Sequence, residues 1–181
     1  SSAAMLSWAP ALRTPAPIRG EGLSTVARFT ISAGETMPFV LTYGPSHRPV
    51  PRAVDPEVAL QATRRFWSRW AARGKVKGPY AQPIQRSLLT LKALTYAPTG
   101  GLVAAPTTSL PEALGGTRNW DYRYCWIRDA TLTLLALMNA EHFTEARAWV
   151  RWLQRAVAGA PDEMQIMYGL AGERRLMEWG A

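Results

Sequence analysis

The sequence predicts a mainly α-helical fold with a small β part. Several segments after residue 55 carry apolar residues at helical spacing, which predicts helices. Two short runs before residue 45 alternate apolar and polar residues, which predicts strands. The chain has 181 residues, of which 48% are apolar, so it is long and apolar enough for one domain or parts of two. This composition excludes a disordered or fibrous protein.

The net charge of +8 is concentrated in one part of the sequence. Ten Lys and Arg residues lie between Arg48 and Lys92, with only Asp55 and Glu57 as acids among them. This segment would suit nucleic-acid binding, but the plainer interpretation is a solvated helix face. The single cysteine, Cys125, excludes an intramolecular disulfide and fits a reducing compartment. Because no stretch is apolar enough for a membrane span and no secretory signal opens the sequence, we expect a cytoplasmic protein.

The two alternating runs lie at residues 25–31 and 39–43. The segment 32–35 between them contains a glycine and predicts a turn, so the two runs predict a β-hairpin. An isolated hairpin is marginally stable in water, and these strands are therefore expected to need partners. Residues 1–20 contain three prolines and no clear period, which predicts irregular structure or a truncated edge.

The first helix is predicted over residues 55–73. Asp55 is suited to cap its N-terminus, Pro56 occupies the first helical position, where proline is favoured, and Gly74 ends the helix. One apolar stripe recurs every four residues and is expected to face a core. It consists of Val58, Ala62, Phe66 and Trp70.

A second helix is predicted to start near Pro83 and to stop before Pro98. Its apolar positions at helical spacing are Ile84, Leu88, Leu91 and Leu94. Residues 102–119 contain a short apolar stretch and then many Pro, Gly, Ser and Thr residues, which predicts a long loop. Loops of this length inside a domain are usually functional or disordered.

Asp129 opens a third predicted helix, which is apolar nearly all round and is therefore expected to be buried on every side. A turn follows at His142 and Phe143, and Thr144 is suited to cap a fourth helix. The fourth helix has one apolar stripe, formed by Ala146, Trp149, Val150, Leu153 and Val157. Two helices joined by a short turn predict an antiparallel helical hairpin with a buried inner helix and an amphipathic outer one.

Residues 119–129 are rich in side chains suited to ligand binding, since they include two Trp, two Tyr, two Asp and two Arg. Aromatic faces stack on sugar rings, and Asp and Arg form charge-assisted hydrogen bonds with sugar hydroxyls. A single-stranded nucleic-acid site also uses stacking, but the two Asp residues would repel phosphates. A purely structural interpretation is also open. It makes Asp129 a helix N-cap, Arg128 the partner of a buried carboxylate, and Trp120 and Trp126 core residues.

This segment and its flanks resemble glycoside hydrolase family 15, which contains glucoamylases, glucodextranases and bacterial trehalases. The similar stretches are RSLLTLKALTYAPTGGLVAAPTTSLPEALGG (86–116), TRNWDYRYCWIRDATLTLLALMNA (117–140) and QIMYGLAGERRL (165–176), and the trehalase-like bacterial branch is the most similar. The resemblance implies the end of an N-terminal β-sandwich at residues 1–50 and a linker helix at 51–80. It implies the first helices of an (α/α)6 barrel at 81–181.

The resemblance also implies a set of substrate-binding residues. The family's Trp-x-Arg-Asp motif matches Trp126, Arg128 and Asp129, of which the Arg and Asp bind glucose hydroxyls in the innermost subsite. Asp121 and Tyr122 match an Asp-Tyr pair whose tyrosine lies against the same sugar. The complete candidate set is Trp120, Asp121, Tyr122, Trp126, Arg128 and Asp129. Neither a cofactor nor a metal ion is implied.

The family hydrolyses α-glucosidic bonds with inversion, using one Glu as general acid and another as general base. Both lie downstream of the stretches matched here, and Gly172 with Glu173 is only a weak match to a loop bordering the site. The resemblance therefore implies a partial chain that carries a glucose-binding half-site, lacks the catalytic pair and is inactive alone. The expected partner is an α-glucoside such as trehalose, a maltooligosaccharide or a starch end, with no nucleic acid and no membrane. The alternative is a non-catalytic carbohydrate-binding or interaction module, and self-association through exposed barrel helices is a further expectation.

Overall fold

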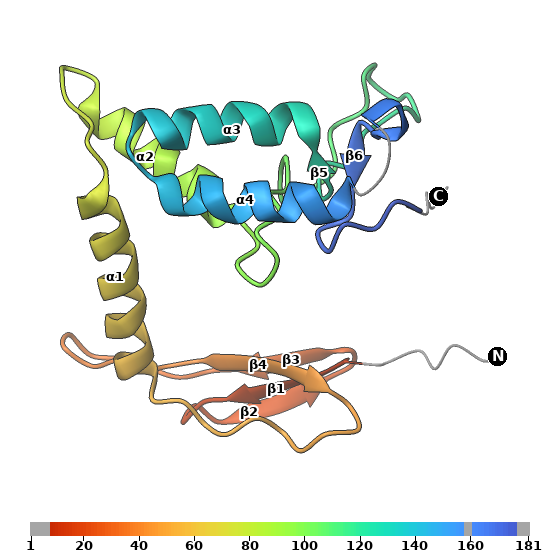
Figure 1. Ribbon diagram of the computed structural model, residues 1–181. Coiled ribbons are helices and arrows are strands. Elements are labelled where there is room, and N and C mark those ends of the chain that lie inside the picture. Colours follow the sequence, from red (N-terminus) through yellow and green to blue (C-terminus); the bar gives the residue numbers. More distant parts are fainter. Residues whose placement is uncertain (1–7, 158–160, 177–181) are drawn as a thin grey trace. The chain divides into compact units, whose positions relative to one another are not determined.

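The computed structural model of the protein describes residues 8–157 and 161–176 (Figure 1). The chain divides into two compact units, residues 1–66 and 67–181, and each is described by itself. The described part of the first unit contains the strands β1 (Trp8–Arg13), β2 (Ile18–Glu21), β3 (Ser24–Ala27) and β4 (Val40–Pro45). Helix α1 (Pro56–Arg73) begins in the first unit and ends in the second. The second unit continues with α2 (Ala81–Ala93), β5 (Cys125–Trp126), α3 (Ile127–Asn139), α4 (Phe143–Ala156), the short 3-10 helix Pro161–Glu163 and β6 (Met167–Tyr168).

This order of elements gives a mixed fold of helices and small sheets, with the helices in the later part of the chain as predicted. Within residues 8–157 and 161–176, no helix combines the length and the hydropathy that a membrane span requires.

The strands of the first unit pair differently from the prediction. β1 pairs with β4 and β2 pairs with β3, both antiparallel, so the predicted hairpin between residues 25–31 and 39–43 is wrong. Two residues, Gly22 and Leu23, join β2 to β3, and Gly22 has a φ of 61° that suits such a tight turn. This short connection orders fewer residues than the longer predicted one and closes at a lower entropic cost.

Of the two interpretations of residues 1–20, irregular structure is wrong where the structure describes them, because β1 and most of β2 lie there. Residues 1–7 lie outside the described part. The segment 28–39 forms no strand, yet the rings of Phe29 and Phe39 lie 5.6 Å apart at its two ends. The alternating runs therefore meet through side chains and not through a backbone ladder.

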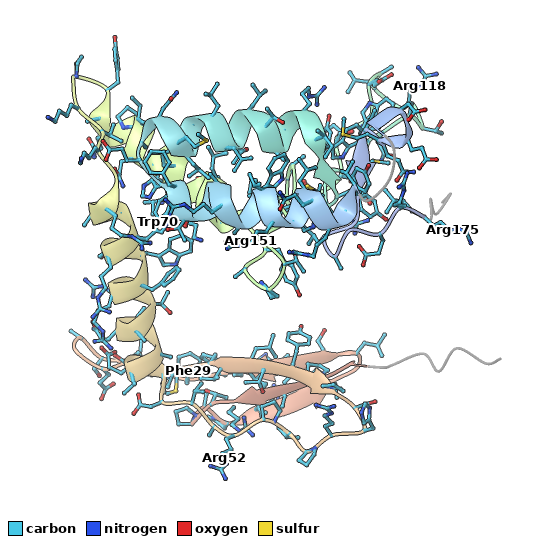
Figure 2. The ribbon with its side chains drawn as sticks, viewed as in Figure 1. Phe29, Arg52, Trp70, Arg118, Arg151 and Arg175 are labelled. Atoms are coloured by element: carbon cyan, nitrogen blue, oxygen red, sulfur yellow. The ribbon has the colours of Figure 1, made fainter. Side chains whose placement is uncertain are left out.

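Helix α1 begins where the sequence predicts. Asp55 caps it, since its Oδ1 accepts hydrogen bonds from the backbone N–H groups of Glu57 at 2.9 Å and Val58 at 3.0 Å. The predicted apolar stripe is buried only at its C-terminal end, where Trp70 is 1% exposed (Figure 2). Val58 and Phe66 are each more than half exposed, so the expectation that the whole stripe faces a core is wrong.

The core of the second unit lies among α2, α3 and α4, with α3 and α4 side by side as the predicted helical hairpin (Figure 1). One cluster joins α3 and α4 to the β5–β6 pair and contains Leu102, Cys125, Ala130, Leu134, Ala146, Trp149, Trp152, Ala156 and Tyr168. A second cluster joins the end of α1 to α2 and α3 and contains Trp70, Leu88, Leu137 and Ala140. These two clusters hold the elements that carry the candidate site.

Helix α3 is buried on one face only, so the prediction of burial on every side is wrong. Its inner face packs in the two clusters, while Leu132, Leu135 and Met138 on the other face are 61%, 56% and 44% exposed. The cause is the arrangement of the described elements, because α2 and α4 cover the inner face.

The turn between α3 and α4 is where the sequence predicts it, but Thr144 is not the cap. Glu141 takes a left-handed conformation with a φ of 64°, and the His142 backbone N–H donates to the Leu137 carbonyl at 2.8 Å. This bond spans six residues and closes α3 in the manner of a Schellman motif. It lets α4 start at Phe143, which places Thr144 inside the first turn.

A buried polar cluster links the end of α1 to α2 and α4. The Glu145 side chain is 4% exposed, and its Oε1 accepts the Trp70 indole N–H at 2.8 Å and pairs with Lys92 Nζ at 3.0 Å. The His142 ring stacks on Trp70 with centroids 3.9 Å apart, and His142 is 3% exposed. Lys92, one of the ten residues of the basic segment, therefore serves the interior of the fold.

The stability of this cluster is expected to fall in acid over two pH ranges. Burial lowers the pKa of His142 below its ordinary 6.5, so below that pH the unfolded chain takes up a proton that the folded chain resists. Burial alone would raise the pKa of Glu145, but hydrogen bonds from Lys92 and Trp70 outweigh it and hold that pKa below the ordinary 4.5. The stabilisation by Glu145 is therefore present above pH 4.5 and lost as the pH falls below it. Urea unfolding midpoints measured from above pH 6.5 to below pH 4.5 are expected to fall first with the protonation of His142 and then with that of Glu145.

The variant His142→Phe keeps a ring for Trp70 to stack on and removes the titrating group. It is expected to abolish the loss of stability that begins as the pH falls below 6.5 and to keep the loss that begins below pH 4.5. The matched control is His47→Phe, since His47 is exposed in the first unit. An unchanged acid response in His142→Phe would contradict the assignment.

Candidate functional site

The predicted long loop forms an irregular two-armed ladder that closes at residues 113–116. Backbone hydrogen bonds connect the arms through the pairs Ala104–Tyr124, Ala105–Tyr122, Ser109–Trp120 and Glu112–Arg118. Gly115 has a φ of 76° at the tip, and Arg118 lies near this tip at the outer edge of the second unit (Figure 2). The ladder fixes the backbone of residues 118–124, which is the first part of the candidate segment.

The second part of the segment is fixed by β5 and by the start of α3. Cys125 and Trp126 pair with Tyr168 and Met167 of β6, and the Ile127 N–H donates to the Ile166 carbonyl at 3.0 Å. Cys125 is fully buried, and this burial raises the pKa of its thiol, which is therefore a packing group. Trp126 stands at the N-cap position of α3.

Two aromatic side chains of the candidate set, Trp120 and Tyr122, lie against the third, Trp126. The ring of Trp126 meets Trp120 edge-on with centroids 6.1 Å apart, and it meets Tyr122 at 5.9 Å with an angle of 70°. Trp120 is 42% exposed, which rules out its interpretation as a core residue, and its indole N–H donates to Glu112 Oε1 at 2.9 Å. Trp126 and Tyr122 are half-buried. The group presents aromatic surface to solvent while its two indole N–H groups are held by hydrogen bonds.

Asp121 lies inside this aromatic group and is held by Arg123. Its Oδ1 accepts the Arg123 backbone N–H at 3.0 Å and Nε at 2.9 Å, and its Oδ2 accepts Nη2 at 2.7 Å. The hydrogen bond from the Arg123 side chain is the main cause that lowers the pKa of Asp121. The Asp121 backbone carbonyl accepts the Trp126 indole N–H at 2.8 Å.

Arg128 and Asp129 form an ion pair on the first turn of α3. Arg128 Nη2 and Nε lie 3.0 Å and 3.2 Å from Asp129 Oδ2, and the two side chains are 70% and 31% exposed. Asp129 is the third residue of the helix and makes no side-chain capping bond, because Trp126 occupies the cap position. The N-cap interpretation of Asp129 is therefore wrong. So is the pairing of Arg128 with a buried carboxylate, since its partner is the adjacent, partly exposed Asp129.

The structure thus places Trp120, Asp121, Tyr122 and Trp126 in one group and pairs Arg128 with Asp129 in another, and the two groups follow one another along the chain. Two residues that support the site were missed, Arg123 and Glu112. Arg123 stands two positions from Asp121, a spacing that permits a local ion pair, whereas Glu112 meets Trp120 only through the fold of the ladder. Gly172 and Glu173 form a tight turn directly after β6, in which the Glu173 carboxylate accepts the Ala171 N–H at 3.0 Å.

The side chains of the site suit recognition of a neutral polyol ring. Aromatic surface beside a carboxylate and a guanidinium, all partly exposed, can stack on a sugar and bind its hydroxyls. Among the described residues, no group of three His, Cys, Asp or Glu side chains is arranged to hold a metal ion.

Residues 78–178 match the profile of Glycosyl hydrolases family 15. A trehalase of Mycolicibacterium smegmatis is 41% identical to the chain over 164 residues, which are 87% of this chain and 24% of the relative. A trehalase of Mycobacterium tuberculosis is 41% identical over 165 residues with the same coverage, and one of Thermoplasma acidophilum is 46% identical over 107 residues, 59% of this chain and 18% of the relative. The chain spans about a quarter of the length of the first two relatives. No solved structure matches it significantly. The match to more than half of the chain identifies it as a member of glycoside hydrolase family 15.

Proposed function

We propose that the chain carries the glucose-binding part of the active site of a trehalase-type glycoside hydrolase. The observation that carries this proposal is the aromatic group of Trp120, Tyr122 and Trp126, which the partly exposed Arg128–Asp129 pair follows along the chain. The names of the relatives, all trehalases, support trehalose as the α-glucoside.

In this proposal the aromatic group forms the wall of the glucose pocket, and the ion pair binds the hydroxyls. Both contacts between Arg128 and Asp129 use Asp129 Oδ2, and Oδ1 would accept a hydrogen bond from a sugar hydroxyl. The Arg128 guanidinium has further N–H groups for hydroxyl oxygens. Such charge-assisted hydrogen bonds are stronger than neutral ones and fix the orientation of the sugar.

The proposal extends to the architecture and the reaction. Residues 1–50 would end a β-sandwich, 51–80 would form a linker helix, and 81–181 would begin an (α/α)6 barrel. The hydrolysis would invert the anomeric carbon between a general acid and a general base. We expect the 181-residue chain by itself to bind the sugar without hydrolysing it, because none of its carboxylates is proposed as either catalytic group.

The substitution Asp129→Asn tests the proposal. It keeps the shape of the side chain and removes the charge that strengthens its hydrogen bonds to hydroxyls. Hydrogen bonds to charged groups contribute about 1.5–3 kcal/mol, so the affinity for trehalose is expected to fall about tenfold to 100-fold. Calorimetric titration of the chain with trehalose measures this change.

The matched control is Asp162→Asn, which removes the same charge from an exposed position in the short 3-10 helix. It is expected to leave the affinity unchanged. The proposal fails if the chain binds neither trehalose nor glucose, or if Asp129→Asn binds trehalose as well as the unchanged chain does.

A further inference from the structure

We infer that Arg123 is a positioning residue of the sugar site and acts on Trp126 through Asp121. The inference rests on the proposed function, since it assigns a role within the same pocket. Arg123 belongs to neither the aromatic wall nor the Arg128–Asp129 pair. Its place in the site comes from its hydrogen bonds alone.

The first step concerns the Asp121 carboxylate, both oxygens of which accept hydrogen bonds from Arg123. Arg123 donates to both oxygens, twice to Oδ1 and once to Oδ2, at distances of 2.7–3.0 Å. A fork of this kind is specific to the planar guanidinium. The carboxylate therefore closes a three-residue turn from Asp121 to Arg123, in which Tyr122 is the middle residue.

The second step is the link from this turn to the aromatic wall. The carbonyl of Asp121 accepts the indole N–H of Trp126 at 2.8 Å, and the ring of Tyr122 lies 5.9 Å from that of Trp126. A turn held by Arg123 fixes the acceptor for Trp126 and the backbone of Tyr122 together. Without the guanidinium, only the Arg123 backbone N–H still donates to the Asp121 carboxylate, so the turn is held less firmly and both rings lose part of their common support.

The third step is the exposure of Arg123. Its side chain is 62% exposed and lies outside the core clusters. An exposed ion pair contributes little to global stability, because solvent screens it and its side chains lose entropy on ordering. A role in placing two neighbouring rings is therefore separable from a role in folding.

The experiment uses the chain labelled with ¹⁵N, with the indole N–H signal of Trp126 assigned from a Trp126→Phe variant. Arg123→Met is expected to accelerate hydrogen exchange at the Trp126 indole and to leave the unfolding midpoint unchanged. The affinity for trehalose is expected to fall about tenfold. This is the lower end of the loss in affinity that follows when a residue that orients a ligating side chain is removed from a metal site. Arg123→Lys is expected to restore part of both effects, since one ammonium reaches one carboxylate oxygen.

Two control variants allow the result to be interpreted. Asp129→Asn is expected to weaken trehalose binding without changing the Trp126 indole signal, because it removes a direct contact. Arg151→Met removes another exposed Arg, which lies on α4 and outside the site, and is expected to change neither measurement.

The inference is overturned if Arg123→Met leaves the Trp126 indole exchange unchanged, or if it alters the indole and leaves the trehalose affinity as before. A general loss of all indole signals with a lower unfolding midpoint would also overturn it, in favour of a purely structural role. If the unchanged chain binds no trehalose, the proposed function fails, and the indole exchange still decides whether Arg123 holds Trp126.

Discussion

Replacing Glu145 by alanine is expected to lower the free energy of unfolding of the second unit by about 3–5 kcal/mol, the usual cost of removing one partner from a buried ion pair. The variant leaves the Lys92 ammonium, whose side chain is only 17% exposed, without its carboxylate. It also leaves the Trp70 indole N–H without its acceptor. Urea unfolding followed by tryptophan fluorescence measures this change well, because seven of the eight tryptophans lie in residues 67–181.

Two further variants separate charge from packing. The double variant Glu145→Leu with Lys92→Met replaces the pair by apolar side chains and is expected to recover most of the stability, since the buried charge is gone. Glu141→Ala removes the exposed pair with Lys75 and is expected to cost about 0–1 kcal/mol. A loss as small as this in Glu145→Ala would show that water or another group compensates Lys92.

The sequence correctly predicted the features that depend on residues close together in the chain. Asp55 followed by Pro56 predicts the start of α1 correctly, because both the cap and the first-turn preference act within a few residues. The turn at His142 was also predicted, although the left-handed residue there is Glu141 and not a glycine. Helical spacing found α2, α3 and α4 for the same local reason.

The errors concern which elements pair with or cover one another. The run at residues 25–31 has the pattern of a strand, but the pattern cannot say that β3 pairs with β2 across Gly22 or that β4 pairs with β1. Helix α3 is apolar nearly all round, which describes what its surface could bury and not which elements cover it. Periodicity predicts which face of a helix or strand is apolar, but only the fold determines which element packs against that face.

The candidate site likewise has parts that the sequence predicts and parts that depend on the fold. Its aromatic residues and the Arg128–Asp129 pair are adjacent in the sequence, so composition alone predicted that they lie together. The contact between Trp120 and Glu112 depends on the ladder, whose arms carry no regular alternation, and could not be predicted. Asp129 was open to a capping role because capping residues stand next to helix starts, and the boundary at Ile127 excludes it.

Replacing Trp152 by alanine is expected to lower the free energy of unfolding of the second unit by about 3–5 kcal/mol, the cost typical of removing a buried aromatic ring. Trp152 is 1% exposed and contacts the rings of Trp149 and Tyr168, with centroids 6.3 Å and 6.0 Å apart. Tyr168 in turn pairs with Cys125, the residue before Trp126. The cavity is therefore also expected to accelerate amide hydrogen exchange in β5, which nuclear magnetic resonance measures directly.

The variant Trp152→Phe separates the packing of the ring from its hydrogen bond. The indole N–H donates to the Leu170 carbonyl at 2.8 Å, but that carbonyl also accepts the Thr99 hydroxyl at 2.7 Å. Because the acceptor stays satisfied and most of the ring remains, Trp152→Phe is expected to cost only about 1–2 kcal/mol. It should also leave the exchange of β5 amides near that of the unchanged chain. Equal losses in the two variants would mean that the hydrogen bond, and not the filled volume beneath β5, holds the candidate site against α4.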